Sequence, residues 1–283
     1  MCDDNINPWL EDPSRRTFGI GVAAAVSLTA AQARAQANVT EKDVKVKTAD
    51  GESDAVLLYP SGRGTWPAVL VWTDIGGLRP VFREMGRRLA AQGYVVLVPN
   101  PFYRSAKPED SAKLSFGTPE GRQALMSYRG AMNDAGVDND AKAYVAFLDA
   151  QPQTNRKKMV GVQGYCMGGP LSFRTAGAVP NRIGAVGSFH GGGLVTAQPN
   201  SPHLLVAKTK ASYLIAVARN DDARAPNDKE VLKKTFEEAK RPATVEVYAG
   251  DHGWCVKGSP VYNEAEAERA WAALSAMYKK SLV

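Results

Sequence analysis

Several features of nucleic-acid and nucleotide binding proteins are absent from this chain of 283 residues. It has no long run of lysine and arginine with interleaved aromatic residues, although 35 basic against 29 acidic residues give a formal charge of +6. A nucleic-acid partner is therefore not indicated. The chain also lacks a phosphate loop of the form G-x-x-x-x-G-K-[ST]. Its mildly basic balance suits anionic small substrates without requiring them.

Cysteine and histidine are scarce, with three of each. Their spacing matches no metal-ligand pattern, so we expect neither a metal site nor a cofactor. No internal repeat and no linker of biased composition divides the chain. With 44% hydrophobic and 23% charged residues, it has an ordinary globular composition and enough length for one sizeable core.

The N-terminal apolar stretch is too short and too weakly apolar for a stable membrane span. Residues 14–18 read SRRTF, a twin-arginine pattern, and small-residue cleavage sites follow at 33–35 and 35–37. We interpret residues 1–37 as a Tat-type signal peptide. This predicts engagement of the Tat export machinery, a periplasmic mature protein and no stable membrane anchor. A disordered or amphipathic extension is the alternative.

Apolar runs and amphipathic segments alternate through residues 38–283. Strands are expected at 44–47, 55–59, 67–72, 94–98, 159–163, 183–188, 212–217 and 244–248. Helices are expected at 80–92, 134–149, 226–240 and 262–280, and a loop-rich segment at 99–133. The alternation predicts one α/β domain with a doubly wound, mostly parallel sheet.

The most informative motif is GYCMGG at residues 164–169, between an apolar strand and the start of a helix. It has the pattern of a nucleophile elbow, with a thiol in place of the usual serine. Gly164 and Gly168 are small because strand and helix must approach each other there. The motif predicts an α/β-hydrolase fold in which Cys166 is the nucleophile, followed in the chain by an acid and a histidine.

A thiol nucleophile needs a base, and the base needs an acid that orients it. His252 directly follows the last predicted strand, where this fold delivers its base. His190 also follows a predicted strand and is a candidate pocket residue or an alternative base, whereas His203 is expected on a surface loop. Asp221 and Asp222 compete for the role of the acid. The plain alternative makes both of them turn carboxylates that cap the next helix.

Cys255 is the second cysteine outside the predicted signal peptide. In an exported protein, a structural disulfide between Cys166 and Cys255 is an alternative to catalysis. Such a bridge would remove the nucleophile from the elbow, so a thiol titration distinguishes the two interpretations.

Four motifs together resemble the dienelactone hydrolase family, from about Val44 to the C-terminus. They are the hexapeptide at 164–169, RLAAQGYVV at 88–96, Asp222 with Pro226 four residues later, and His252 followed by glycine. The resemblance implies an α/β-hydrolase fold and a triad of Cys166, His252 and Asp222, the last favoured by the proline. It also implies that a small-molecule enol-lactone, such as carboxymethylenebutenolide, or a related ester is hydrolysed through an acyl-enzyme.

The resemblance also implies which groups surround the nucleophile. The backbone N–H groups of Met167 and Ile75 would form the oxyanion hole. Asp74 stands where the family usually has a glutamate that helps to activate the thiol, and it is one methylene shorter. A simple turn aspartate is the alternative interpretation of Asp74.

Recognition of the substrate is where the chain departs from the family. Val256 replaces a family arginine, and Arg104 and Arg122 lie in the segment where the family places another one. Trp254, like His190, is a substrate-binding candidate and suggests a more apolar pocket. These departures leave two alternatives open, a broad-specificity carboxylesterase and a non-catalytic small-molecule-binding module on a hydrolase scaffold.

Overall fold

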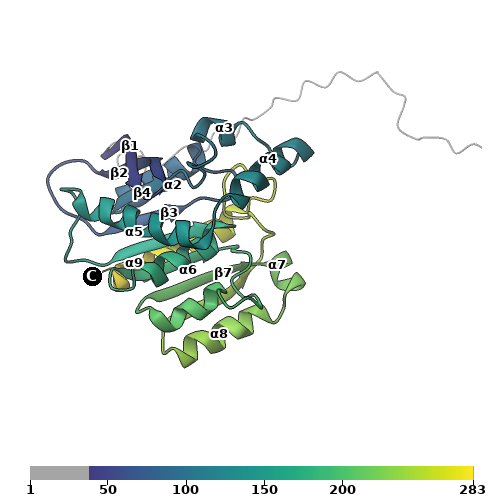
Figure 1. Ribbon diagram of the computed structural model, residues 1–283. Helices are drawn as coiled ribbons and strands as arrows, with labels where there is room; N and C mark the ends of the chain where they lie inside the picture. Colours follow the sequence, from purple (N-terminus) through teal and green to yellow (C-terminus); the bar gives the residue numbers. More distant parts are fainter. Residues whose placement is uncertain (1–37, 283) are drawn as a thin grey trace, which may run out of the picture.

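The computed structural model describes residues 38–282, and the predicted signal peptide lies outside them. Within these residues, eight strands form one sheet in the order β1-β2-β4-β3-β5-β6-β7-β8 (Figure 1). The strands are β1 (Val39–Thr48), β2 (Gly51–Pro60), β3 (Ala68–Trp72), β4 (Val95–Pro99), β5 (Val160–Tyr165), β6 (Ile183–Phe189), β7 (Ser212–Ala218) and β8 (Ala243–Tyr248). The hairpin of β1 and β2 pairs antiparallel to β4, and all pairs from β4 to β8 are parallel.

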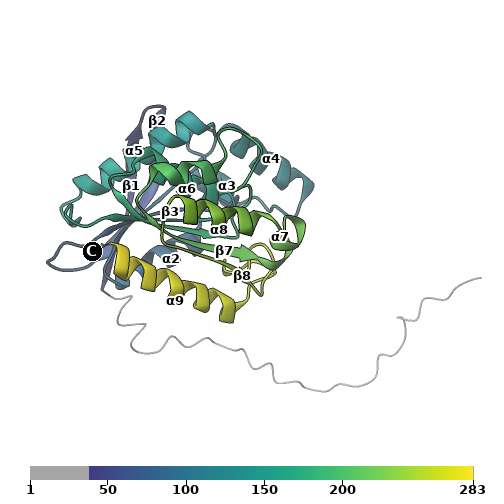
Figure 2. The same cartoon turned by 90° about the horizontal axis from the view of Figure 1, so that it is seen from below.

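Helices cover both faces of the sheet. Figure 2 shows α2 (Pro80–Ala91) and α9 (Glu264–Ser281) on one side, with α5 (Asp134–Ala150), α6 (Gly168–Ala178) and α8 (Asp228–Glu238) on the other. Successive residues of a strand point to opposite faces. Leu70 and Trp72 of β3 accordingly belong to one apolar cluster and Val69 and Val71 to the other. The predicted doubly wound, mostly parallel sheet in a single domain is confirmed.

Three segments differ from the sequence expectation. The segment 99–133, expected to be loop-rich, contains α3 (Pro108–Ala112) and α4 (Pro119–Gly130). Each of these helices begins at a proline, Pro108 or Pro119, because proline lacks the N–H that the first helical position leaves unpaired. A short 3-10 helix, η1 (Pro202–Lys208), precedes β7, and a further short helix, α7 (Arg219–Arg224), directly follows β7. None of the described helices is long and apolar enough to cross a membrane.

Candidate active site

Cys166 lies at the turn between β5 and α6. Its φ of 53° is unusual for a residue other than glycine, and strained backbone of this kind is concentrated at functional sites. The Cys166 N–H donates to the carbonyl oxygen of Phe189, and the N–H of Gly169 donates to the carbonyl oxygen of Cys166, each over 3.1 Å. These two bonds fix the turn at the carboxyl end of the parallel strands, where the Cys166 side chain is partly exposed.

The two glycines of the elbow are required by close backbone contacts. A Cβ atom on Gly164 would lie 1.9 Å from the carbonyl oxygen of Gly168. One on Gly168 would lie 2.7 Å from the carbonyl oxygens of Trp72 and Thr73 at the end of β3. The close approach of strand and helix predicted from the motif is therefore present.

His252 lies in the irregular segment between β8 and α9. Its Nδ1–H donates to Oδ2 of Asp221 over 2.6 Å, while its backbone N–H donates to Oδ1 of Asn220 over 2.8 Å. The other carboxylate oxygen of Asp221 accepts from Arg224 over 2.7 Å. The structure thus brings together the predicted histidine and one of the two competing aspartates.

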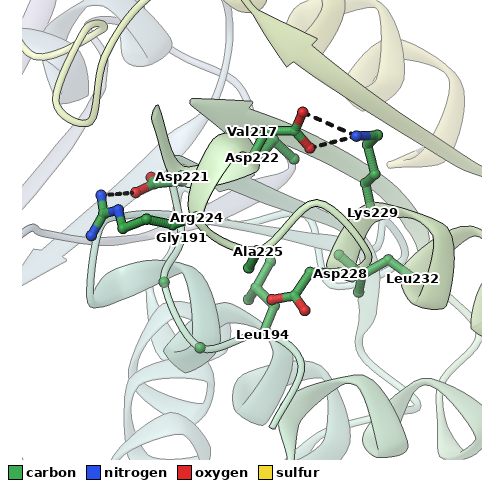
Figure 3. Close-up of a pocket in the computed structure, with 12 residues that line it drawn as sticks. Gly191, Leu194, Val217, Asp221, Asp222, Arg224, Ala225, Asp228, Lys229 and Leu232 are labelled. Carbon is green, nitrogen blue, oxygen red and sulfur yellow. Dashed lines mark hydrogen bonds and ion pairs between the residues drawn. The ribbon is translucent and has the colours of Figure 1, made fainter. Parts of the chain in front are cut away.

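Asp222, the aspartate that the resemblance favoured, does not contact His252. It forms an ion pair of 2.7 Å with Lys229 of α8 instead, as Figure 3 shows. The difference arises because α7 begins at Arg219, so that consecutive side chains point about 100° apart around the helix. Asp221 therefore faces the histidine, and the sequence preference for Asp222 is corrected.

The surroundings of His252 favour its protonated form. Burial lowers the pKa of the imidazole, but hydrogen bonds to Asp221 and Cys166 and the charges of both groups outweigh this and raise it to about 10. The imidazolium of His252 is therefore the positively charged partner of the Asp221 carboxylate near neutral pH.

His190 is buried directly behind His252. The two ring centroids are 4.7 Å apart with an interplanar angle of 63°, and His190 also has a positive φ of 40°. Both ring nitrogens of His190 are buried and lack a hydrogen-bond partner among the described residues. Burial, with the nearby charge of His252, lowers its pKa to about 3, so the ring is neutral. His190 therefore contacts the base from inside the core.

The predicted oxyanion-hole donors are free to act. Among residues 38–282, neither the Met167 N–H nor the Ile75 N–H donates to a protein acceptor. Ile75 follows β3, whose last carbonyl groups abut Gly168 at the start of α6. The two N–H groups thus come from segments that meet beside the nucleophile.

Asp74 is engaged away from the nucleophile. Both of its carboxylate oxygens accept hydrogen bonds from Arg79, one of them over 2.7 Å, and Oδ1 also accepts from the N–H of Gly76. The structure shows no hydrogen bond between Asp74 and Cys166. Burial raises the pKa of the Cys255 thiol well above its usual value, and the charge of Asp74 adds to the effect. Asp74 is thus paired with Arg79, and the two cysteines within the described residues, Cys166 and Cys255, are free thiols.

The remaining candidates for substrate binding lie in different settings. Arg104 is engaged in structural ion pairs: its guanidinium pairs with Asp50 and with the buried Asp140. Trp254 is fully buried and stacks on Tyr248 at a centroid distance of 4.8 Å. Arg122 is exposed on α4. Of these three side chains, only Arg122 is open to solvent.

A cavity of about 200 Å³ lies between α7, α8 and the loop after β6 (Figure 3). Its lining residues are Gly191, Gly192, Gly193, Leu194, Val217, Asp221, Asp222, Arg224, Ala225, Asp228, Lys229 and Leu232. Cys166 and His252 are not among them, so the cavity borders the acid and not the nucleophile. No pattern in the sequence indicated it. Within the described part of the chain, no three His, Cys, Asp or Glu side chains are grouped to hold a metal ion.

Comparisons with known proteins identify the family and the fold of the chain. A model of the dienelactone hydrolase family matches residues 53–282. The chain is 26% identical to the carboxymethylenebutenolidase of Rhodococcus opacus over 189 residues, which are 66% of this chain and 69% of the relative. It is 30% identical to Protein usf of Aquifex pyrophilus over 226 residues, which are 76% and 89% of the two chains.

The fold is shared with a solved structure. The dienelactone hydrolase from Anabaena variabilis superposes with a TM-score of 0.58 at 18% identity, covering 87% of this chain and 100% of that one. The predicted α/β-hydrolase fold is thereby confirmed. On the match over residues 53–282, the chain belongs to the dienelactone hydrolase family.

Proposed function

We propose that this hydrolase uses Cys166 as the nucleophile, His252 as the base and Asp221 as the acid to cleave lactones or esters. The observation that carries the proposal is the bond between His252 Nδ1 and Asp221 beside a cysteine on a strained elbow. Nucleophile, acid and histidine follow one another in the chain order typical of α/β-hydrolases.

In the first step, the Cys166 thiolate attacks the carbonyl carbon of the substrate. The new S–C bond moves the carbonyl electron pair onto oxygen, where the N–H groups of Met167 and Ile75 receive it. Donors of this kind each contribute a factor of about 10² to 10³ in rate. Collapse of the intermediate breaks the ring or ester C–O bond. The leaving oxygen departs as a stabilised enolate or takes the proton of the His252 imidazolium.

In the second step, water releases the acyl group. Acylation removes the thiolate, and with it the Cys166 contribution that raises the pKa of His252. His252 then loses its proton more readily and acts as a base toward water, held in place by Asp221. The products are the carboxylic acid and the free Cys166 thiol.

Enol-lactones are the substrate class that the family and the name of the Rhodococcus opacus relative favour. One observation favours a broader carboxylesterase as a second candidate. Val256 is buried where the family has an arginine, and Arg104 is already paired with Asp140. Recognition of a substrate carboxylate would then depend on Arg122, and neutral esters would be accepted as well.

A hydrolysis panel tests the proposal. Wild type, Cys166→Ala, Cys166→Ser and the matched control Cys255→Ala are compared on dienelactone and on short p-nitrophenyl esters. We expect both Cys166 variants to lose at least about 10³-fold in kcat/KM, and Cys255→Ala to stay near wild type. Turnover that survives in Cys166→Ala contradicts the mechanism. Thermal stabilisation by dienelactone without turnover indicates a binding module instead.

We also propose that residues 1–37 direct export by the Tat machinery, on the twin-arginine pattern alone. Replacing Arg15 and Arg16 together by lysine should retain the protein in the cytoplasm. The control is Arg34→Lys, which lies outside the pattern. If the double variant is still found in the periplasm, the export proposal is contradicted, and the catalytic proposal is unaffected.

A further inference from the structure

His252 is held at two points by consecutive residues of α7. Asp221 accepts from its side chain over 2.6 Å, and Asn220 accepts from its backbone N–H over 2.8 Å. The acceptor on Asn220 is the amide oxygen, since an N–H donor requires an oxygen partner. The first turn of α7 therefore fixes both the main chain and the imidazole of His252, which lies in the segment after β8.

The segment that carries His252 is irregular and is anchored beyond the histidine by the buried Trp254. It runs from the end of β8 to α9 without a strand or a helix, so no regular backbone ladder fixes the main chain at His252 itself. Two further links reach it from Arg219: its backbone N–H donates to the carbonyl oxygen of Gly250, and its exposed guanidinium pairs with Asp251 over 3.0 Å. Among these bonds from α7, only the one to Asn220 involves the backbone of His252 itself.

We propose that Asn220 is a positioning residue for the reaction. By accepting a hydrogen bond from the His252 N–H, Asn220 fixes the position of the main chain at His252. The imidazole can then interact with Asp221 and Cys166 at the same time. Asn220 acts through His252 and does not touch the reacting atoms. The inference rests on the proposed function, because it assumes that His252 is the base.

The rate consequence follows from geometry. An imidazole that bridges an acid and a thiol has its ring position set by its main chain and two side-chain torsions. A displacement of about 1 Å in catalytic machinery can cost about 10²-fold in rate. Loss of the Asn220 bond should therefore lower kcat while leaving KM nearly unchanged, since substrate contacts stay in place.

Three variants test the inference. Asn220→Ala removes the acceptor, Asn220→Asp keeps an oxygen at the same position, and Arg219→Ala is the matched control that cuts the exposed ion pair to the same segment. For each, kcat and KM are measured with the best substrate of the panel. In parallel, the pH profile of iodoacetamide alkylation of Cys166 is followed by mass spectrometry, which needs no turnover.

We expect Asn220→Ala to lose 10-fold or more in kcat with KM within about 2-fold, and to react several-fold more slowly with iodoacetamide at pH 6, because the thiolate loses its imidazolium partner. Asn220→Asp should recover most of both losses, and Arg219→Ala should resemble wild type. A purely structural role predicts a lower melting temperature with an unchanged alkylation profile.

Two results separate the failure of this inference from that of the proposed function. If Asn220→Ala matches wild type in alkylation profile and in kcat, the positioning role is overturned. If wild type hydrolyses nothing in the panel, the proposed function fails, and the alkylation profiles alone still decide whether Asn220 places His252 beside Cys166.

Discussion

His190 and His252 lie edge to face, with ring centroids 4.7 Å apart, and only His252 has an acid to pair with. Two imidazoles this close cannot both carry a charge at low cost. The inner ring, 1% exposed and without a hydrogen-bond partner among the described residues, is the one that stays neutral.

His190 should make the fold sensitive to acid. Its pKa in the folded state is about 3, below the ordinary value of 6.5. Its neutrality thus stabilises the native state above pH 6.5, and this stabilisation is lost as the pH falls from 6.5 towards 3. The loss amounts to on the order of 3 kcal/mol by pH 4.

Urea unfolding of wild type and His190→Phe at pH 7 and pH 4 measures this loss. We expect the free energy of unfolding to fall less in the variant, because phenylalanine fills the space without binding a proton. His203→Phe is the control, since His203 lies on η1 away from His252. Equal losses in wild type and His190→Phe contradict the prediction.

The assignment of the acid predicts a sharp contrast between neighbours. Asp221→Asn should lower kcat by about 10²-fold or more, because the imidazole loses the partner that orients it and stabilises its charge. Asp222→Asn removes only the partly exposed pair with Lys229, worth about 0 to 1 kcal/mol of stability, and should keep near-wild-type kcat. Steady-state kinetics on one ester decides, and a larger loss in Asp222→Asn restores the family pattern.

The raised pKa of His252 predicts that kcat/KM falls at high pH, and that the size of this fall depends on the leaving group. A poor alkoxide leaving group needs the proton of the imidazolium, so kcat/KM on a simple alkyl ester should fall as the pH rises through about 10. A p-nitrophenolate leaves without a proton, so the same limit should be weaker there. Rates from pH 7 to 10.5 for both esters measure the difference. Identical alkaline limits indicate that His252 is not the proton donor.

Gly164→Ala should break the elbow. Its Cβ would overlap the carbonyl oxygen of Gly168 at 1.9 Å, which only a backbone shift relieves. We expect a loss of about 3 kcal/mol or more in the free energy of unfolding, in the range of severe core changes. Gly130→Ala at the end of α4 has no atom within 4 Å of its new Cβ and is the matched control. Denaturant unfolding of both variants tests this, and similar stabilities refute it.

Arg104 and Arg122 should differ in what their removal costs. Arg104→Ala leaves the buried Asp140 without its charged partner and should destabilise the fold by about 3 to 5 kcal/mol. Arg122→Ala should leave stability within about 0.5 kcal/mol and, where the substrate carries a carboxylate, raise KM. Melting curves and KM on dienelactone separate the two roles. A stable Arg104→Ala with raised KM would return Arg104 to the substrate site.

The residues that could be predicted from sequence are those whose position follows from local pattern. Cys166 is marked by its flanking glycines, and His252 by its place after the last strand. The choice between Asp221 and Asp222 could not be predicted, because it depends on the phase of α7, a six-residue helix with no distinct apolar period.

The ion pairs of Arg104 and Asp74 could not be predicted from the sequence either. Arg104 meets Asp140 across 36 positions of the chain, and nothing in the spacing of either residue indicates the contact. Asp74 was placed near the thiol by resemblance, but Arg79 is only five residues away and captures both of its oxygens. Side-chain pairing depends on which residues the fold brings together, whereas strands and helices are predicted from the local periodicity of the sequence.

The position of β8 at the edge of the sheet has a consequence for synthesis of the protein. Chains fold progressively as they emerge, and the elbow is complete once α6 has formed. Asp221 and His252 follow β7 and β8, the last two strands of the chain. On the proposed mechanism, the elbow thiol is therefore synthesised well before the histidine that activates it, and reactivity is expected only after β8 has been made.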